Sequence, residues 1–181
     1  MIINYPIEKF NKVKTELSKN WNSINSEFIF WTPSTSNIIG YDLYNWNDTE
    51  FPHTYDLINH IKENRYVYSI ILYIYNPYTR TTFHTDPSKF RYVYPIVSND
   101  MCFNYEIKTN TSQAKMDKKL FAIDSIDKLK EFNTEFIEEG NLVSNWKENE
   151  CYLIGSNIHA HLNYSDTLRI AMVIDNRETL I

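Results

Sequence analysis

His84-Thr85-Asp86 is the first stretch of the sequence whose side chains suit metal chemistry. On an extended segment, residues two apart point to the same side, so the His84 imidazole and the Asp86 carboxylate can reach one ion. The same triplet also suits a turn in which Asp86 caps the backbone before Pro87 and His84 ends a strand. The triplet alone is therefore only a hypothesis about a metal site.

Two more histidines follow in Ile158-His159-Ala160-His161. A strand here places both imidazoles on one face, where either can supply a further ligand. The alternatives are a polar pair between strands at the surface, or one hydrogen-bonded histidine in the core.

A buried arginine is predicted in the last strand, Thr167-Leu-Arg-Ile-Ala-Met-Val-Ile174. Hydrophobic residues occupy both faces of this strand, which is typical of an interior position. Burying the Arg169 guanidinium is costly unless an anion meets it. That anion is either a ligand or a carboxylate of the protein itself, and burial does not choose between them.

The turn-forming residues 163–166 predict a hairpin that folds about Tyr164. His159 and Arg169 lie five residues to either side of Tyr164, so the hairpin would place them opposite each other on one face. An anion could then bridge a metal and the guanidinium, and a short dicarboxylate fits that description. This geometry favours His159 over His161 as the ligand.

His84, Asp86 and His159 together would occupy three positions of an octahedral metal and leave three open. Non-haem Fe(II) oxygenases use this facial arrangement, in which the open positions take a cosubstrate and O₂. Zinc also accepts such ligands, but a structural zinc site wants a fourth protein ligand and usually cysteines.

Residues 66–176 resemble the Fe(II)/2-oxoglutarate-dependent oxygenase superfamily, and within it the aspartyl/asparaginyl β-hydroxylase branch, which includes some proline hydroxylases. The motifs that carry the resemblance are His-Thr-Asp-Pro at 84–87, Phe-Arg-Tyr-Val-Tyr-Pro-Ile at 90–96, Trp-Lys-Glu-Asn-Glu at 146–150 and His-Ala-His-Leu-Asn-Tyr-Ser-Asp-Thr-Leu-Arg at 159–169. Two positions depart from the branch, because Val93 replaces a frequent histidine and Asn149 replaces the glycine of a Trp-x-x-Gly turn.

The resemblance implies roles for seven residues. The metal ligands would be His84, Asp86 and His159, the distal carboxylate of 2-oxoglutarate would bind Arg169, and the further cosubstrate contacts would be Arg91, Tyr73 and Tyr75. The implied reaction consumes O₂ and 2-oxoglutarate, releases succinate and CO₂, and hydroxylates an amino-acid or peptidyl side chain, with ascorbate as a possible requirement in vitro. His161 would orient a ligand or substrate, or be a surface strand residue.

The spacing of hydrophobic residues predicts N-terminal helices followed by short strands. The predicted helices are 6–19, 55–64 and a short one at 126–132, and the predicted strands are 28–31, 66–75, 90–97, 101–107, 151–154, 158–163 and 168–175. We expect a mainly β fold, a double-stranded β-helix or jelly roll, in one domain that spans residues 1–181. Residues 1–65 would form the helical buttress and first strand, and 66–176 the catalytic barrel.

Three segments between these elements have open interpretations. Ser98-Asn99-Asp100 predicts a hairpin between its flanking strands. The polar excursion at 112–133 would be a lid. The aromatic segments 28–31 and 41–46 would line a substrate entrance or, more commonly for such residues, pack in the core.

Composition excludes several other functions. Only 3 glycines occur, far apart, so no glycine-rich loop can cradle a nucleotide. The net charge of −5 and the scattered lysines argue against nucleic-acid binding, and no hydrophobic run is long enough to span a membrane. With no leader pattern and two cysteines outside any disulfide framework, we expect a cytoplasmic protein.

Two other functions remain open from the sequence. One is a cupin-like metal-dependent isomerase or dioxygenase that does not use 2-oxoglutarate, and the other is a non-catalytic binding module on the same barrel. The partner would be a small-molecule or peptide substrate. The sequence identifies neither this substrate nor the oligomeric state.

Overall fold

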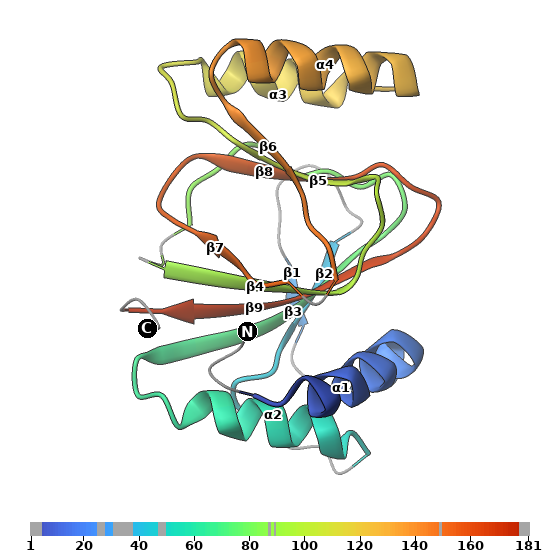
Figure 1. The fold of residues 1–181 in the computed structure, drawn as a ribbon, viewed down its shortest axis with the longest axis vertical. Coiled ribbons are helices and arrows are strands. Elements are labelled where there is room, and N and C mark those ends of the chain that lie inside the picture. The colour runs from blue at the N-terminus through green and yellow to red at the C-terminus, as the bar shows by residue number, and fades with distance from the viewer. Residues whose placement is uncertain are drawn as a thin grey trace.

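Two antiparallel β-sheets face each other between two pairs of helices in the computed structural model (Figure 1). The structure describes residues 5–24, 28–30, 38–46, 50–86, 88, 90–148 and 150–177, without the side chains of 28–30. The elements in chain order are α1 (Ile7–Asn20), the short 3₁₀ helix η1 (Trp21–Ser23), β1 (Phe28–Phe30), β2 (Ile38–Asp42), α2 (Pro52–Lys62), β3 (Val67–Tyr75), β4 (Phe90–Val97), β5 (Cys102–Glu106), α3 (Gln113–Phe121), α4 (Ile126–Glu138), β6 (Leu142–Asn145), β7 (Tyr152–Ile154), β8 (His159–Asn163) and β9 (Arg169–Asn176).

The major sheet has the strand order β1-β2-β3-β9-β4-β7, and the minor sheet has the order β6-β5-β8. Each pairing is antiparallel. The mainly β fold with a jelly-roll arrangement is therefore confirmed. No helix within the described residues has the length and hydrophobicity to cross a bilayer.

Side chains along the central strands of the major sheet point alternately to its two faces, and each face belongs to a different hydrophobic core. One face packs against α1 and α2 and includes the core residues Ile70, Leu72, Ile74, Tyr92, Tyr94, Ile170, Met172 and Ile174. The opposite face looks toward the minor sheet and includes Tyr73, Tyr75, Val93, Ala171 and Val173. Arg169 shares this inner face because it lies two residues before Ala171.

The N-terminal helices are fixed to each other by a carboxylate cap. Glu16 of α1 accepts hydrogen bonds from the backbone N–H groups of His53, at 3.0 Å, and Thr54, at 2.8 Å. These are free N–H groups of the first turn of α2, which a carboxylate satisfies well. α2 begins at Pro52, three residues before the predicted start, because proline suits the first helical position.

The minor sheet presents one face to α3 and α4 and the other to the major sheet. Ala160 and Leu162 of β8 pack in the hydrophobic cluster under these helices. His159 and His161 alternate with them and therefore face the space between the sheets. The predicted lid at 112–133 is wrong, because α3 and α4 pack on the outer face of the minor sheet, away from the histidines (Figure 1).

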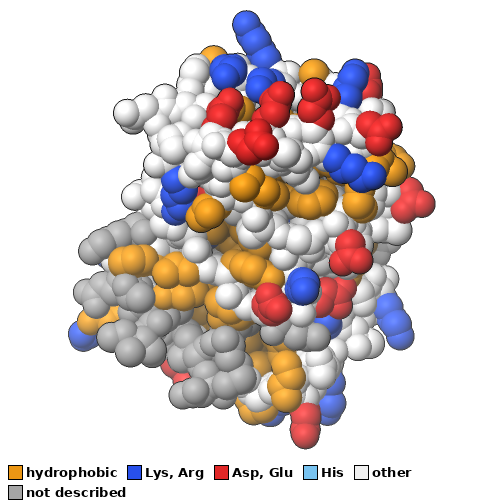
Figure 2. All heavy atoms as spheres, turned by 45° about the horizontal axis from the view of Figure 1, so that its top comes forward, with side chains coloured by type: hydrophobic (Ala, Val, Ile, Leu, Met, Phe, Trp, Pro, Cys, Tyr) orange, Lys and Arg blue, Asp and Glu red, His pale blue; other side chains and the backbone are white. Residues whose placement is uncertain are grey.

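Oppositely charged side chains cover the outer helical layer (Figure 2). Lys115 pairs with Glu139 at 3.2 Å across the two helices, and Lys119 pairs with Glu135. Such exposed pairs contribute little to stability, so the buried cluster beneath α3 and α4 holds the layer in place.

The extended segment 79–84 continues the minor sheet beyond β8. Its backbone exchanges hydrogen bonds with β8 between His84 and His159 at 2.9 and 2.8 Å, and Thr81 N–H donates to the His161 carbonyl at 2.9 Å. α3 holds the same segment from outside, because Asp117 accepts from the Phe83 N–H at 2.7 Å. A helix that the sequence did not predict thus buttresses the segment that carries His84.

Two predicted hairpins are wrong. β4 pairs with β7 and β9, whereas β5 pairs with β6 and β8, so residues 98–100 connect the two sheets. Likewise β8 lies in the minor sheet and β9 in the major sheet, so His159 and Arg169 are not cross-strand neighbours. Turn residues reveal where a chain reverses, but the pairing of strands depends on contacts far apart in sequence.

The sequence also missed β2, β6 and α3, and it placed the end of α4 at 132 although the helix continues to Glu138. The segment 41–46 packs in the core beneath the major sheet, as Tyr41, Leu43 and Trp46 show. A substrate entrance there is therefore wrong, and Trp31 of the other aromatic segment lies outside the described residues.

Asn163 organises the crossing from β8 to β9. Its Nδ2 donates to the carbonyls of Tyr75 at 3.3 Å, Asn76 at 3.1 Å and Thr167 at 2.8 Å. Its Oδ1 accepts from Ser165 at 2.8 Å. One fully buried amide therefore ties the end of β3 to the turn that begins β9.

Asn163→Ala should lower the free energy of unfolding by about 2–4 kcal/mol, because the buried hydrogen bonds of its amide to three carbonyl groups are lost. Urea denaturation of the two proteins measures the difference. Asn110→Ala, at an exposed position, is the matched control and should stay within about 0.5 kcal/mol of wild type. Equal stability of both variants would contradict this role of Asn163.

Candidate metal centre

His84, Asp86 and His159 converge on one point between the sheets. Each offers one ligand atom, and the three atoms lie within 4.8 Å of one another. His84 Nε2 is 3.8 Å from Asp86 Oδ1, and His159 Nε2 is 3.1 Å from Asp86 Oδ2. The minor sheet supplies both histidines, because His84 and His159 face each other across an isolated β-bridge.

The outer ring nitrogens of both histidines contact carbonyl groups. His84 Nδ1 lies 2.8 Å from the Thr82 carbonyl oxygen, and His159 Nδ1 lies 2.9 Å from that of Asn157. A carbonyl can only accept, so each Nδ1 carries the proton and each Nε2 presents a lone pair to the site. Metal-binding histidines are oriented in this way.

The protonation states of two candidate ligands suit a metal. Burial and the neighbouring His159 lower the pKa of His84 to about 4, so its imidazole is neutral at neutral pH. Burial by itself raises the pKa of Asp86, but His159 and the Arg91 guanidinium outweigh it and hold that pKa below its usual value. A neutral imidazole and an ionised carboxylate therefore face a common point with His159.

The residues present fit a divalent metal ion. Asp86 Oδ2 and His159 Nε2 are buried without a hydrogen-bond partner among the described residues. These two atoms lie 3.1 Å apart, and a cation bound by both would satisfy them. A His/Asp/His set with open positions is typical of non-haem Fe(II).

Arg169 lies in the same interior with no partner for its charge. Its side chain is fully buried, and Nε, Nη1 and Nη2 each lack a hydrogen-bond partner among the described residues. Its guanidinium carbon lies 4.9 Å from the ring centre of Tyr75 and 4.7 Å from that of Trp146. No carboxylate of the described residues meets the guanidinium, so its N–H donors are open to an anionic ligand.

A narrow cavity is lined both by His84 of the triad and by Tyr75 and Trp146, the two rings that contact the Arg169 guanidinium. It is lined by Tyr73, Tyr75, His84, Arg91, Val93, Trp146, His161 and Val173. Its volume is about 10 Å³, roughly the space of one water molecule. Burial raises the pKa of both Tyr73 and Tyr75, so their hydroxyl groups stay protonated and can donate.

Arg91 also reaches the cavity, but its nitrogens contact carboxylates of the protein. Nε and Nη2 lie 2.7 and 3.1 Å from the two oxygens of Asp175, and Nη1 contacts Asp86 Oδ1. Burial by itself lowers the pKa of Arg91, but these two carboxylates raise it above its ordinary value. A cosubstrate contact for Arg91 therefore stays a prediction, while its contact with a metal ligand is observed.

His161 is not a surface residue, because only 6% of it is exposed. Its ring lies 5.2 Å from that of His159 and 4.9 Å from that of Trp146. Burial, His159 and Arg169 lower the pKa of His161 well below its usual value, and its Nδ1 has no partner among the described residues. It faces the cavity between the triad and Arg169.

Sequence reasoning missed the structural roles of Trp146 and Asp175. The sequence shows Trp146 only as part of a turn motif, whereas its buried ring lies under the Arg169 guanidinium and contacts the His161 ring. Asp175 lies six residues after Arg169 on β9, so the two side chains share one face of the strand. The alternation of side chains along this strand could have identified Asp175 from the sequence. Asn149 of the turn motif lies outside the described residues.

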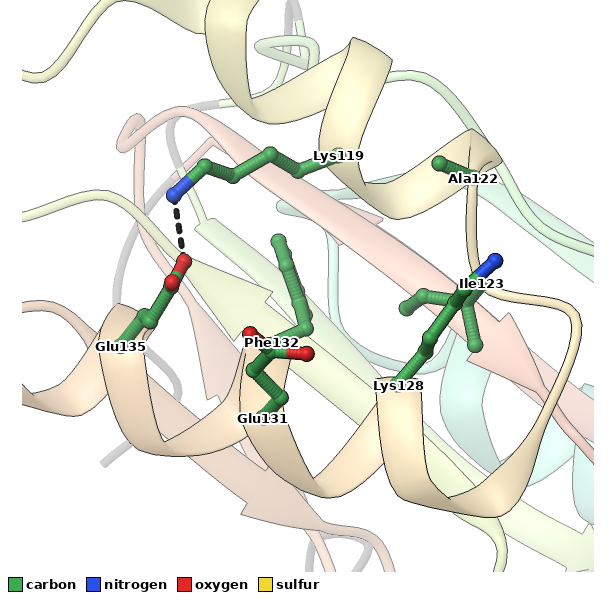
Figure 3. A pocket seen from close by; sticks show the side chains of 7 residues that line it. All are labelled: Lys119, Ala122, Ile123, Lys128, Glu131, Phe132 and Glu135. Atoms are coloured by element: carbon green, nitrogen blue, oxygen red, sulfur yellow. Dashed lines mark hydrogen bonds and ion pairs between the residues drawn. The ribbon is translucent and has the colours of Figure 1, made fainter.

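A second hollow, of about 230 Å³, lies between α3 and α4. Figure 3 shows Lys119 reaching across it to Glu135, with Lys128 and Glu131 at its rim. Phe132 and Ile123, which line it, belong to the core under the helices. This hollow is on the opposite side of the minor sheet from the triad and contains no cluster of metal ligands.

Solved structures with similar folds include two proteins from nogalamycin biosynthesis. The non-heme α-ketoglutarate-dependent epimerase SnoN is 9% identical, with a TM-score of 0.55 over 94% of this chain and 73% of its own. The carbocyclase SnoK, described with the same dependence, is 11% identical, with a TM-score of 0.55 over 94% and 75%. The fold is a double-stranded β-helix.

A cupin domain from Bordetella pertussis Tohama I also superposes, with 12% identity and a TM-score of 0.43 over 81% of this chain and 100% of its own. No protein-family model matches the chain, and no curated protein matches it. At these identities the likeness shows the fold, and the chemistry rests on the site itself.

A divalent metal should stabilise the wild-type protein and not the variants His84→Ala and His159→Ala. Fe(II) at a concentration about 100 times its Kd adds about 2.7 kcal/mol to the stability of a protein with one intact site. Anaerobic thermal unfolding with and without Fe(II) measures the metal-induced shift in Tm for each protein. His60→Ala, on α2, is the matched control and should keep the full shift. A full shift in His159→Ala would rule out this metal centre.

Proposed function

We propose that this protein is an Fe(II)- and 2-oxoglutarate-dependent oxygenase that hydroxylates an amino-acid or peptidyl side chain. The observation that carries the proposal is the fully buried Arg169, which has no partner among the described residues and whose two aromatic contacts line one cavity with His84 of a His/Asp/His triad. A metal binds one end of a short dicarboxylate and a guanidinium binds the other. The names of the two fold relatives agree with this cosubstrate.

In this proposal His84, Asp86 and His159 hold iron through their inward-facing atoms. Iron and 2-oxoglutarate, when bound, supply the oxidative decarboxylation that is coupled to hydroxylation. Arg169 binds the distal carboxylate with two parallel N–H donors, and its burial strengthens that contact. The phenols of Tyr73 and Tyr75 and the free Nδ1 of His161 provide polar contacts between the two ends.

The protein's own part in the chemistry is orientation and exclusion of water. Val93 and Val173 of the major sheet line the cavity, so a bound cosubstrate is shielded on their sides. All the proposed site residues come from 66–176, which we propose as the catalytic barrel. The helices α1 and α2 cover the outer face of the major sheet and do not reach the site.

The two other candidate functions do not produce succinate. Neither a cupin-like enzyme that does not use 2-oxoglutarate nor a non-catalytic module explains why the Arg169 guanidinium is buried without a counter-ion among the described residues. Incubating the protein with Fe(II), ascorbate and 2-oxoglutarate and measuring succinate separates them. Succinate release that increases with particular amino acids or short peptides identifies the substrate, and its absence together with no effect of 2-oxoglutarate on Fe(II) binding rejects the proposal.

Arg169→Met should raise the KM for 2-oxoglutarate by about 30-fold to 1,000-fold, because the distal carboxylate loses a buried charged partner. The metal-induced shift in Tm should stay at the wild-type value, since no metal ligand changes. Succinate release at increasing 2-oxoglutarate measures the KM. Arg65→Met, at an exposed position, is the matched control with an unchanged KM. Loss of metal binding in Arg169→Met would contradict the separation of the two roles.

Binding of 2-oxoglutarate should move Trp146, because a cavity of about 10 Å³ cannot hold the cosubstrate while that ring lies over Arg169. With Zn(II) in the site to prevent turnover, 2-oxoglutarate should change the tryptophan fluorescence of the wild-type protein. Trp146→Phe should remove this change, whereas Trp21→Phe should keep it. The same change in wild type and Trp146→Phe would show that Trp146 stays in place.

A further inference from the structure

A buried charge cluster adjoins the metal triad. Arg91, Asp175 and Ser88 are 8%, 5% and 3% exposed. Arg91 and Asp175 lie directly opposite each other on β4 and β9, where they form two parallel contacts at 2.7 and 3.1 Å. Ser88 donates a further hydrogen bond to Asp175 Oδ1 at 2.6 Å. Asp175 is thus held by two side chains and in turn fixes the plane of the guanidinium.

This cluster gives the two oxygens of Asp86 different surroundings. Oδ1 contacts Nη1 of Arg91, the nitrogen that Asp175 does not use. Oδ2 is turned toward His159 Nε2 and has no hydrogen-bond partner among the described residues. Only Oδ2 is therefore available to a metal.

The number of available oxygens matters for the open positions of the metal. A free carboxylate can bind a metal through both oxygens and would then occupy an additional position. Two imidazoles and a carboxylate bound through one oxygen leave three positions, which is the number that a chelating cosubstrate and O₂ together need. An arginine that occupies one carboxylate oxygen preserves the third position.

We propose that Arg91 and Asp175 are positioning residues that keep Asp86 a ligand through Oδ2 alone. This inference rests on the proposed function, and it assigns Arg91 a role toward the metal ligand and not toward the cosubstrate. Asp175 neutralises the guanidinium and orients Nη1 at Asp86. The cluster thereby sets how many positions on the metal remain open to 2-oxoglutarate.

The test uses Co(II), whose visible absorption reports the number and kind of its ligands. The double variant Arg91→Met/Asp175→Asn removes one charge of each sign, so it leaves no unpaired charge between the two strands. Ser88→Ala removes only the outermost hydrogen bond and is the matched control. Each protein is titrated with Co(II) and then, at saturating Co(II), with 2-oxoglutarate, and circular dichroism checks the fold.

In the double variant, Co(II) affinity should fall by about tenfold, as is common when a ligand loses its outer hydrogen bond. At saturating Co(II), the absorption spectrum should differ from that of wild type, and 2-oxoglutarate should bind at least about tenfold more weakly. Ser88→Ala should keep the wild-type spectrum. A merely structural role would change the Co(II) affinity or the Tm but leave the saturated spectrum and the 2-oxoglutarate affinity unchanged, and that result overturns the proposal.

Two further outcomes are distinguishable. If wild type binds Co(II) but not 2-oxoglutarate, the proposed function fails, and the Co(II) spectra without 2-oxoglutarate still decide the coordination of Asp86. If the double variant does not fold, Arg91→Lys replaces it. A lysine has one nitrogen and cannot contact both carboxylates. A wild-type spectrum in Arg91→Lys overturns the inference, and an altered one supports it.

Discussion

A positive charge buried without a counter-ion among the described residues is the constraint on which the rest of this structure depends. Arg169 is fully buried, and removing an unpaired ion from water costs on the order of several kcal/mol. Stacking on Tyr75 and Trp146 offsets part of that cost, at about 2 kcal/mol for each desolvated aromatic face. Aromatic faces do not accept the in-plane N–H donors, which have no hydrogen-bond partner among the described residues. The fold therefore retains an incomplete anion site.

The two inward-facing arginines of the major sheet differ in one respect that separates their roles. Arg91 has a partner in Asp175, directly across the strand pair, and it extends one nitrogen to a metal ligand. Arg169 lies opposite Tyr75, and no carboxylate in the described part of the chain meets it. A neutralised guanidinium can hold a neighbouring side chain in place, whereas an open one binds a ligand. Strand pairing thus assigned different chemistry to two residues of the same type.

The layers around the site explain how the triad is held. His159 belongs to β8, and His84 lies on a segment that hydrogen-bonds to β8 from one side and to α3 from the other. Backbone contacts fix both histidines. Their Nδ1 atoms therefore lie against carbonyl groups, and their Nε2 atoms both lie near the Asp86 carboxylate. The helices α3 and α4 act through this buttressing and not by covering the site.

The sequence by itself determined the three candidate metal ligands, the burial of Arg169 and the face that His159 and His161 share, because alternation along a strand is a local property. It also predicted most of the strands and the jelly-roll class. Only the tertiary structure decided that Arg169 meets no carboxylate of the described residues, that Arg91 contacts Asp86, and that Trp146 covers the Arg169 guanidinium. These contacts join residues from different strands and from both sheets. Strand pairing is set by packing across the whole domain, so no local pattern could reveal them.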